Sequence, residues 1–264
     1  MNTEIINILT YFIIYSFLGW VLESVTKTVM QRKWVNSGFL FGPFCPIYGI
    51  GAIIMYLFLD SFKGKWILLF FIGFFVLSVW EYIVGWLLEK FFQTKYWDYS
   101  NYKFNIHGRV CLMNSIFWGI LGVLFVNVIH PFIDAKIQLI PENHLIYLNI
   151  LLYAYIIVDV ITSIIKVKNI DIKLKKISEL GESIKEKLEK LEEMKKSPNL
   201  KQANLENIQD IVNELKLKQS RLRRKLYKQT YRLKKAFPTM KSEKITNFLN
   251  EKIDNIKNRH KEKE

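Results

Sequence analysis

The chain has 264 residues, of which 50% are hydrophobic and 15% aromatic, and its formal net charge is +14. Residues 1–165 contain ten Lys and Arg against nine Asp and Glu, whereas residues 166–264 contain twenty-eight against fifteen. An apolar, near-neutral first part followed by a basic, polar second part excludes a single soluble globule and a disordered protein. With only two Cys, a small disulfide scaffold is excluded as well.

Five apolar stretches of the first part approach or exceed the roughly 20 residues that a membrane-spanning helix needs. They are about 5–29, 45–62, 66–92, 110–133 and 145–166. Gly49 and Gly51 interrupt the second stretch, which leaves a bent or partly re-entrant segment open there. We expect an all-α polytopic membrane bundle with five spans over residues 1–166.

Basic residues are divided unequally between the loops. With five spans, the first and third loops share a side with the C-terminus and hold seven Lys and Arg. The opposite loops hold only Lys63, Lys65 and Lys136. Because cytoplasmic loops carry the excess of Lys and Arg, this asymmetry predicts an outside N-terminus and a cytoplasmic C-terminal domain.

An internal repeat with an offset of 66 residues relates the first four spans. Nine of 48 aligned positions, 11–58 against 77–124, are identical. The rarer residue types fall in register: Gly19 with Gly85, Trp20 with Trp86, Glu23 with Glu89, Gly42 with Gly108, and Cys45 with Cys111. We interpret the pattern as a tandem two-span unit whose parallel copies are related by an axis along the membrane normal, with coincidence in a biased composition as the alternative.

A set of motifs extends over roughly residues 10–135. It comprises Gly19-Trp20-x-x-Glu23, Gly42-Pro43-x-Cys45-Pro46-Ile47-Tyr48-Gly49, Glu81-Tyr82-x-x-Gly85, Trp97-Asp98-Tyr99-Ser100 and Gly108-Arg109-x-Cys111. In these motifs the chain resembles the CmpB-like family of ABC-transporter type IV permeases. The resemblance implies a multi-pass protein of bacterial plasma membranes and a role in transport, but little mechanism.

Four carboxylates lie within or near the ends of the apolar stretches: Glu23, Glu81, Glu89 and Asp159. An ionisable group within the membrane is costly and indicates function, and Glu81 lies deepest. Glu81, Gly85 and Glu89 share one helix face, where Gly85 would let another helix approach. We expect a polar cavity between the repeats with Arg109 as counter-charge; a buried Glu–Arg pair that only fixes helix packing is the alternative.

Signatures of catalysis and metal binding are missing from the sequence. Cys45 and Cys111 have no His nearby and are expected to be structural, with metal binding or redox chemistry as the alternative. The aromatic residues around Asp98 are typical of a membrane-interface belt. No nucleotide-binding or hydrolase motif occurs, so we expect neither an enzyme nor a cofactor, and an ABC system would need a separate ATPase.

Beyond Lys166 apolar residues recur at heptad spacing, first over 170–191 and then over 205–233. Ser197-Pro198-Asn199 separates the two runs, and a shorter amphipathic helix is expected over 245–256. The short break favours an antiparallel hairpin, with a dimeric coiled coil as the alternative. Residues 167–264 are therefore predicted to form a cytoplasmic coiled-coil domain.

A basic stretch at 220–237 contains eight Lys and Arg and no acid: Arg221, Arg223, Arg224, Lys225, Lys228, Arg232, Lys234 and Lys235. The first hairpin helix would rise about 45 Å over thirty residues, and the second would return by a similar length. This geometry favours contact with anionic lipid headgroups over nucleic-acid binding.

Two functions compete at this point. The first is a permease-like subunit with a polar path lined by carboxylates, working with a separate ATPase. The second is a membrane-anchored scaffold or sensor that presents the coiled coil to a protein partner. A membrane enzyme ranks third, and the oligomeric state, including a homo-oligomer, is open.

Overall fold

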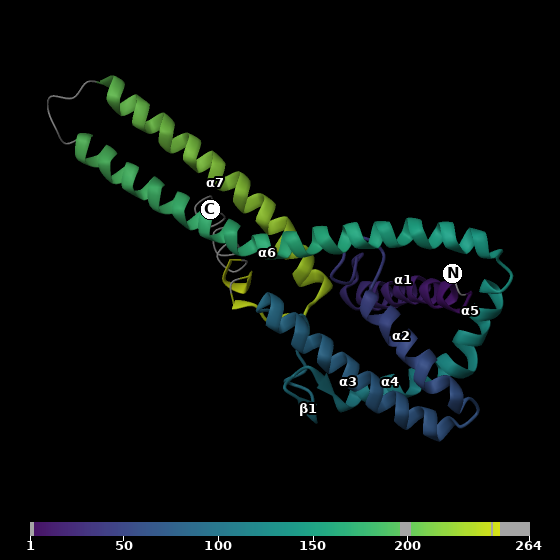
Figure 1. The fold of residues 1–264 in the computed structure, drawn as a ribbon. Helices are drawn as coiled ribbons and strands as arrows, with labels where there is room; N and C mark the ends of the chain where they lie inside the picture. The colour runs from purple at the N-terminus through teal and green to yellow at the C-terminus, as the bar shows by residue number, and fades with distance from the viewer. Residues whose placement is uncertain (1–2, 196–201, 244, 249–264) are drawn as a thin grey trace. The chain divides into compact units, whose positions relative to one another are not determined.

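The computed structural model describes residues 3–195, 202–243 and 245–248, which are helical almost throughout (Figure 1). The helices are α1 (Thr3–Gln31), α2 (Pro46–Leu59), α3 (Trp66–Phe92), α4 (Leu112–Leu124), α5 (His130–Ile137), α6 (Glu142–Lys195) and α7 (Gln202–Ala236). The short elements are η1 (Asp60–Phe62), η2 (Phe125–Ile129), β1 (Asn105–Ile106) and β2 (Val110–Cys111). The all-α membrane class expected from the sequence is confirmed.

Four helical stretches are long and apolar enough to cross a membrane: Thr3–Gln31, Trp66–Phe92, Leu112–Ile137 and the apolar part of Glu142–Met194. The remaining apolar helix, Pro46–Phe62, is shorter than these four. Its 17 residues would rise about 25 Å, less than the roughly 30 Å of a hydrocarbon core. Four spans are therefore supported, and the fifth, through α2, stays a prediction.

The chain divides into two compact units. Met1–Ser163 and Leu233–Phe248 form the first, here called the membrane unit. Of the second, here called the hairpin, the structure describes residues 164–195 and 202–232. The described residues of 233–248 thus group with the membrane unit, and the cytoplasmic domain expected over 167–264 stays a prediction.

The membrane unit contains two helix–loop–helix segments in the same order. α1 is followed by a loop and α2, and α3 by a loop and α4 (Figure 1). Cys45 directly precedes α2, and Cys111 directly precedes α4. The second loop alone carries a hairpin, β1 paired antiparallel with β2. This common order agrees with the tandem-repeat interpretation, which stays a prediction.

Glycines let the two helices of each segment touch. A Cβ atom on Gly19 of α1 would lie 2.3 Å from the Tyr48 side chain of α2. A Cβ atom on Gly119 of α4 would lie 2.7 Å from the ring of Phe70 on α3. Neither position leaves room for a side chain, so small residues at these crossings bring the helix backbones together.

The hairpin consists of the end of α6 and most of α7, which run antiparallel. Lys173 Nζ donates to Gln229 Oε1 at 3.0 Å, and Gln219 Nε2 donates to the carbonyl of Ile177 at 3.0 Å. Towards the far end, Ile184 packs with Val212 in one apolar cluster. Residue numbers thus rise along α6 as they fall along α7. The coiled-coil assignment itself stays a prediction, and most of the helix expected over 245–256 lies outside the described residues.

Candidate functional site

Glu81 lies on α3 and is the most deeply buried of the four carboxylates singled out from the sequence, with 5% of its surface exposed. Asn114 Nδ2 donates to both of its oxygens at 2.7 and 2.9 Å. Trp118 Nε1 donates at 3.0 Å and the hydroxyl of Tyr99 at 3.2 Å. All four donor bonds come from neutral groups, and no Lys or Arg in the described ranges forms an ion pair with Glu81.

Glu23, near the end of α1, has a different set of partners. Lys27, one turn further along, lies 2.7 Å from its carboxylate. The hydroxyl of Ser37 donates to Glu23 at 2.6 Å, and that of Tyr48 donates at 3.0 Å. Glu23 is therefore a paired carboxylate that also joins the loop after α1 to the start of α2.

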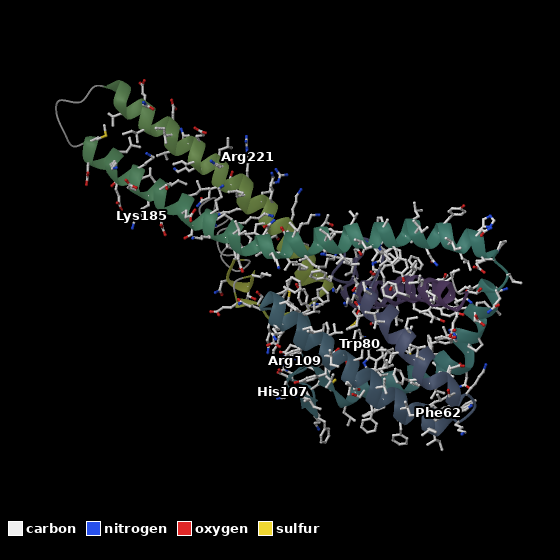
Figure 2. All side chains as sticks on the ribbon, in the orientation of Figure 1. Phe62, Trp80, His107, Arg109, Lys185 and Arg221 are labelled. Atoms are coloured by element: carbon white, nitrogen blue, oxygen red, sulfur yellow. The ribbon has the colours of Figure 1, made fainter. Side chains whose placement is uncertain are left out.

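Aromatic side chains connect these two carboxylate sites. The ring of Tyr48, which binds Glu23, lies 5.9 Å from the ring of Trp118, which binds Glu81. A second link joins α3 to α2, because Trp80 of α3 donates its indole N–H to the carbonyl of Ile47 at 3.0 Å (Figure 2). These contacts connect the two helix–loop–helix segments between Glu23 and Glu81, and the polar cavity expected there stays a prediction.

Glu89, at the end of α3, pairs with Arg109. Nε and Nη2 of Arg109 both contact one carboxylate oxygen, at 3.1 and 2.8 Å. Arg109 Nη1 also donates to the hydroxyl of Tyr82 at 3.1 Å, and His107 lies beside this group (Figure 2). Arg109 is therefore the counter-charge of Glu89 and not of Glu81. The Glu–Arg packing pair considered from the sequence exists, but it lies about two helical turns along α3 from Glu81.

Gly85 does not receive another helix, which differs from expectation. A Cβ atom there would lie 3.2 Å from the Trp97 ring and 3.5 Å from Cβ of Arg109. Both neighbours belong to the loop after α3, and the Trp97 indole donates to the Arg109 carbonyl at 2.9 Å. The aromatic motif folds back over α3, with Tyr99 reaching Glu81, and its position at a membrane interface stays a prediction.

Asp159 of α6 has a separate task. Its two oxygens accept the backbone N–H groups of Phe41, at 3.0 Å, and Gly42, at 2.6 Å. Ser163 Oγ donates to the same carboxylate at 3.2 Å. The sequence grouped Asp159 with the other intramembrane carboxylates. In the structure it binds the loop after α1 and does not contact Glu81.

Both cysteines are free and buried. Cys45 lies under the first loop, where a Cβ atom on Gly38 would come within 2.6 Å of its Sγ. Cys111 lies in β2, opposite Asn105. In the ranges that the structure describes, no three His, Cys, Asp or Glu side chains are grouped so that they could hold a metal ion.

A second buried polar cluster was missed in the sequence. The Tyr15 hydroxyl lies 2.9 Å from Nδ1 of buried His130, and the Tyr11 hydroxyl donates to Asp134. The ring of Phe125 stacks on His130 at 5.4 Å. Tyr11 and Tyr15 are four residues apart on α1, and His130 and Asp134 are four residues apart on α5. This spacing would have been a signal had the two helices been known to face one another.

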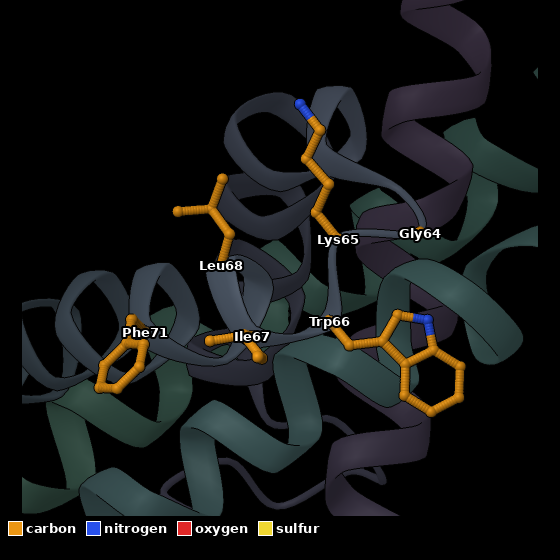
Figure 3. Close-up of a pocket in the computed structure, with 6 residues that line it drawn as sticks. All are labelled: Gly64, Lys65, Trp66, Ile67, Leu68 and Phe71. Carbon is orange, nitrogen blue, oxygen red and sulfur yellow. The ribbon is translucent and has the colours of Figure 1, made fainter.

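A shallow depression at the start of α3 does not belong to the site. Its lining consists of Gly64, Lys65, Trp66, Ile67, Leu68 and Phe71, whose side chains spread over an open surface (Figure 3). Trp66 and Ile67 are 66% and 78% exposed. An apolar, exposed surface at the end of a membrane-spanning helix is expected to face lipid.

The apolar helices and the buried carboxylates together define a polytopic helical membrane protein. Residues 10–164 match the family described as "Putative ABC-transporter type IV". The match covers more than half of the chain, so the protein belongs to this family. The matched range includes the four carboxylates and Arg109 and ends at residue 164, where the hairpin begins. Neither a curated protein nor a solved structure matches the chain.

Proposed function

We propose that this protein is the membrane-embedded, permease-like subunit of an ABC-type transport system and that its polar path runs along Glu23, Tyr48, Trp118 and Glu81. The contrast between two carboxylates on α3 carries the proposal. Glu89 is paired with Arg109, which is the arrangement expected of a carboxylate that only fixes helix packing. Glu81 is more buried but is held only by neutral donors, which can exchange for a substrate group or a proton.

A separate ATPase would supply the energy, because the chain has no nucleotide-binding motif. Affinity purification in mild detergent, followed by identification of the co-purifying proteins, tests this partnership. We expect an ATPase with a Walker A motif among them. Its consistent absence would contradict the proposal.

The proposed orientation places the N-terminus outside and the hairpin in the cytoplasm of a bacterial cell. The basic residues of the two loops that cover the carboxylates support it, together with the basic hairpin. Reporter fusions at Lys65 and Lys136 should then report an exterior location, and a fusion at Lys190 an interior one. A cytoplasmic signal at Lys136 would contradict five spans in this orientation.

A scaffold or sensor is the second candidate. The hairpin exposes large apolar or aromatic side chains: Ile172, Leu217 and Tyr231 are 65%, 51% and 49% exposed, although the Tyr231 ring also stacks on Tyr227 at 5.6 Å. Such residues suit a protein partner. Substituting all three with Ser and repeating the purification separates the two functions: a partner lost with these changes, in preparations that contain no ATPase, would favour the scaffold.

A further inference from the structure

The described residues of 233–248, here called the strap, comprise the last turn of α7 and the segment after it, and they pack against the loop after α3. The strap buries Leu233, Ala236, Met240, Ile245 and Phe248. Its Phe237 ring meets the Tyr96 ring edge-on at 5.0 Å. Lys95 and Lys241 exchange two backbone hydrogen bonds of 3.1 and 2.9 Å, as in an antiparallel strand pair. The strap is thus bound to the loop after α3 by backbone pairing as well as by side-chain packing.

An ion pair fixes the strap at one point of that loop. Lys241 Nζ contacts the Asp98 carboxylate, whose side chain is only 4% exposed, and Thr239 Oγ1 accepts the Asp98 backbone N–H at 3.3 Å. Ser100 Oγ donates to Asp98 at 2.5 Å. Although burial on its own raises the pKa of the Asp98 carboxyl, the hydrogen bonds from Lys241 and Ser100 hold it below its ordinary value.

This anchor adjoins the buried carboxylate site. Tyr99 follows Asp98 in the chain, its backbone N–H donates to the Gly108 carbonyl at 2.8 Å, and its hydroxyl reaches Glu81. Fixing Asp98 from the strap and Gly108 from within the loop leaves Tyr99 little freedom. The loop after α1 is arranged in a corresponding way, because Asp159 binds its tip while its Ser37 reaches Glu23.

We propose that Lys241 and Asp159 are positioning residues that each hold one loop closed over one carboxylate: Lys241 holds residues 93–111 over Glu81, and Asp159 holds residues 32–45 over Glu23. This inference rests on the proposed path along these carboxylates. Asp159 lies five residues before the hairpin begins, and the strap starts where the hairpin ends. A partner that binds the hairpin can therefore act on both loops through chain continuity alone.

The two native cysteines report on the two loops separately. Cys111 is part of the second loop and is 1% exposed, and Cys45 lies under the first loop and is 4% exposed. Alkylation of the full-length protein by N-ethylmaleimide, followed by mass spectrometry of each cysteine, measures the opening of each loop. This readout needs no transport activity, so it can fail or succeed independently of the proposed function.

Lys241→Glu places a second carboxylate against Asp98. We expect Cys111 to be alkylated about tenfold faster, the order expected when a charged hydrogen bond to a buried group is lost, with Cys45 unchanged. Lys241→Gln, a milder change at an exposed side chain, should give a smaller increase of the same kind. Lys241→Arg keeps the charge and should react as the wild type does.

Asp159→Asn makes the reverse test. The single oxygen of the Asn side chain can still accept one backbone N–H. The NH₂ group faces the other backbone N–H donor, so that hydrogen bond is lost. Cys45 should then react faster while Cys111 keeps its wild-type rate. Equal acceleration of both cysteines in every variant would mean general loosening and would overturn the inference, as would unchanged rates in Lys241→Glu and Asp159→Asn.

Discussion

The two helix–loop–helix segments of the membrane unit differ most at the position where their sequence register matches Tyr15 with Glu81. Both segments carry a paired carboxylate near the end of the long helix, Glu23 with Lys27 and Glu89 with Arg109. Only the second has a carboxylate deeper in the helix. In the first segment Tyr15 stands there and binds His130. The clearest functional difference between the segments should therefore lie at this position, and the Glu89–Arg109 pair should mainly stabilise the fold.

The largest difference should appear when the two matched positions are truncated. Glu81→Ala removes the acceptor of four hydrogen bonds and leaves Asn114, Trp118 and Tyr99 without it, which should destabilise the protein by about 3 kcal/mol. Tyr15→Phe loses one neutral hydrogen bond and should cost about 1 kcal/mol. Thermal unfolding in detergent measures both. Equal losses would remove the distinction between the segments.

The two shared ion pairs should also differ, but less. Arg109 makes three hydrogen bonds from the loop to α3, whereas Lys27 bonds Glu23 within its own helix and Ser37. We expect Arg109→Gln to cost about 2 kcal/mol and Lys27→Gln about 1 kcal/mol in the same unfolding assay. A larger cost for Lys27→Gln would show that the first loop depends on its ion pair more than the geometry indicates.

Much of this architecture could be predicted from sequence. The length of the apolar stretches predicted the long helices. Heptad spacing, together with the short break at Ser197-Pro198-Asn199, predicted the antiparallel hairpin. The strap could not be predicted, because Asp98 and Lys241 are far apart in the chain and each looks like an ordinary surface charge. The contact of Tyr99 with Glu81 could not be predicted for a similar reason: the motif shows only its aromatic composition, whereas the contact depends on how the loop folds back.

The basic stretch shows how the structure refines a compositional prediction. Lys234 donates to the Met240 carbonyl at 2.9 Å, and Lys235 donates to the Trp34 carbonyl, so both stabilise the strap. Arg223 and Arg232 are partly buried. The side chains left exposed for anionic lipid are Arg221, Arg224, Lys225 and Lys228.

Substituting these four with Gln in the hairpin fragment 164–232 should weaken its binding to vesicles containing phosphatidylglycerol, by about 1 kcal/mol per charge near the surface. Added salt should weaken the wild-type binding in the same direction. The matched control changes four exposed lysines elsewhere on the hairpin: Lys175, Lys176, Lys185 and Lys190. Equal losses in both variants would mean that only net charge matters, and a fragment that ignores these vesicles would contradict the lipid prediction.

The smallest expected effect is the pH dependence of the strap. Because the pKa of Asp98 is depressed in the folded state, its ion pair stabilises the protein above the unfolded pKa of about 3.9 and is lost as pH falls through the folded value. The unfolding temperatures of wild type and Lys241→Gln should differ at pH 7, and this difference should disappear as the pH falls below the folded pKa of Asp98. A gap that persists below the folded pKa would mean that Lys241 acts without Asp98.

The complex that we propose with a separate ATPase would give the most direct test of the central claim, that Glu81 is functional and Glu89 structural. The measurement is the rate of ATP hydrolysis by complexes co-purified with wild type, Glu81→Gln and Glu89→Gln at matched protein amounts. We expect Glu81→Gln to slow hydrolysis by about tenfold, equivalent to roughly 1.4 kcal/mol, while Glu89→Gln stays within about twofold of wild type. Wild-type rates in both variants, or a larger loss in Glu89→Gln than in Glu81→Gln, would contradict the account.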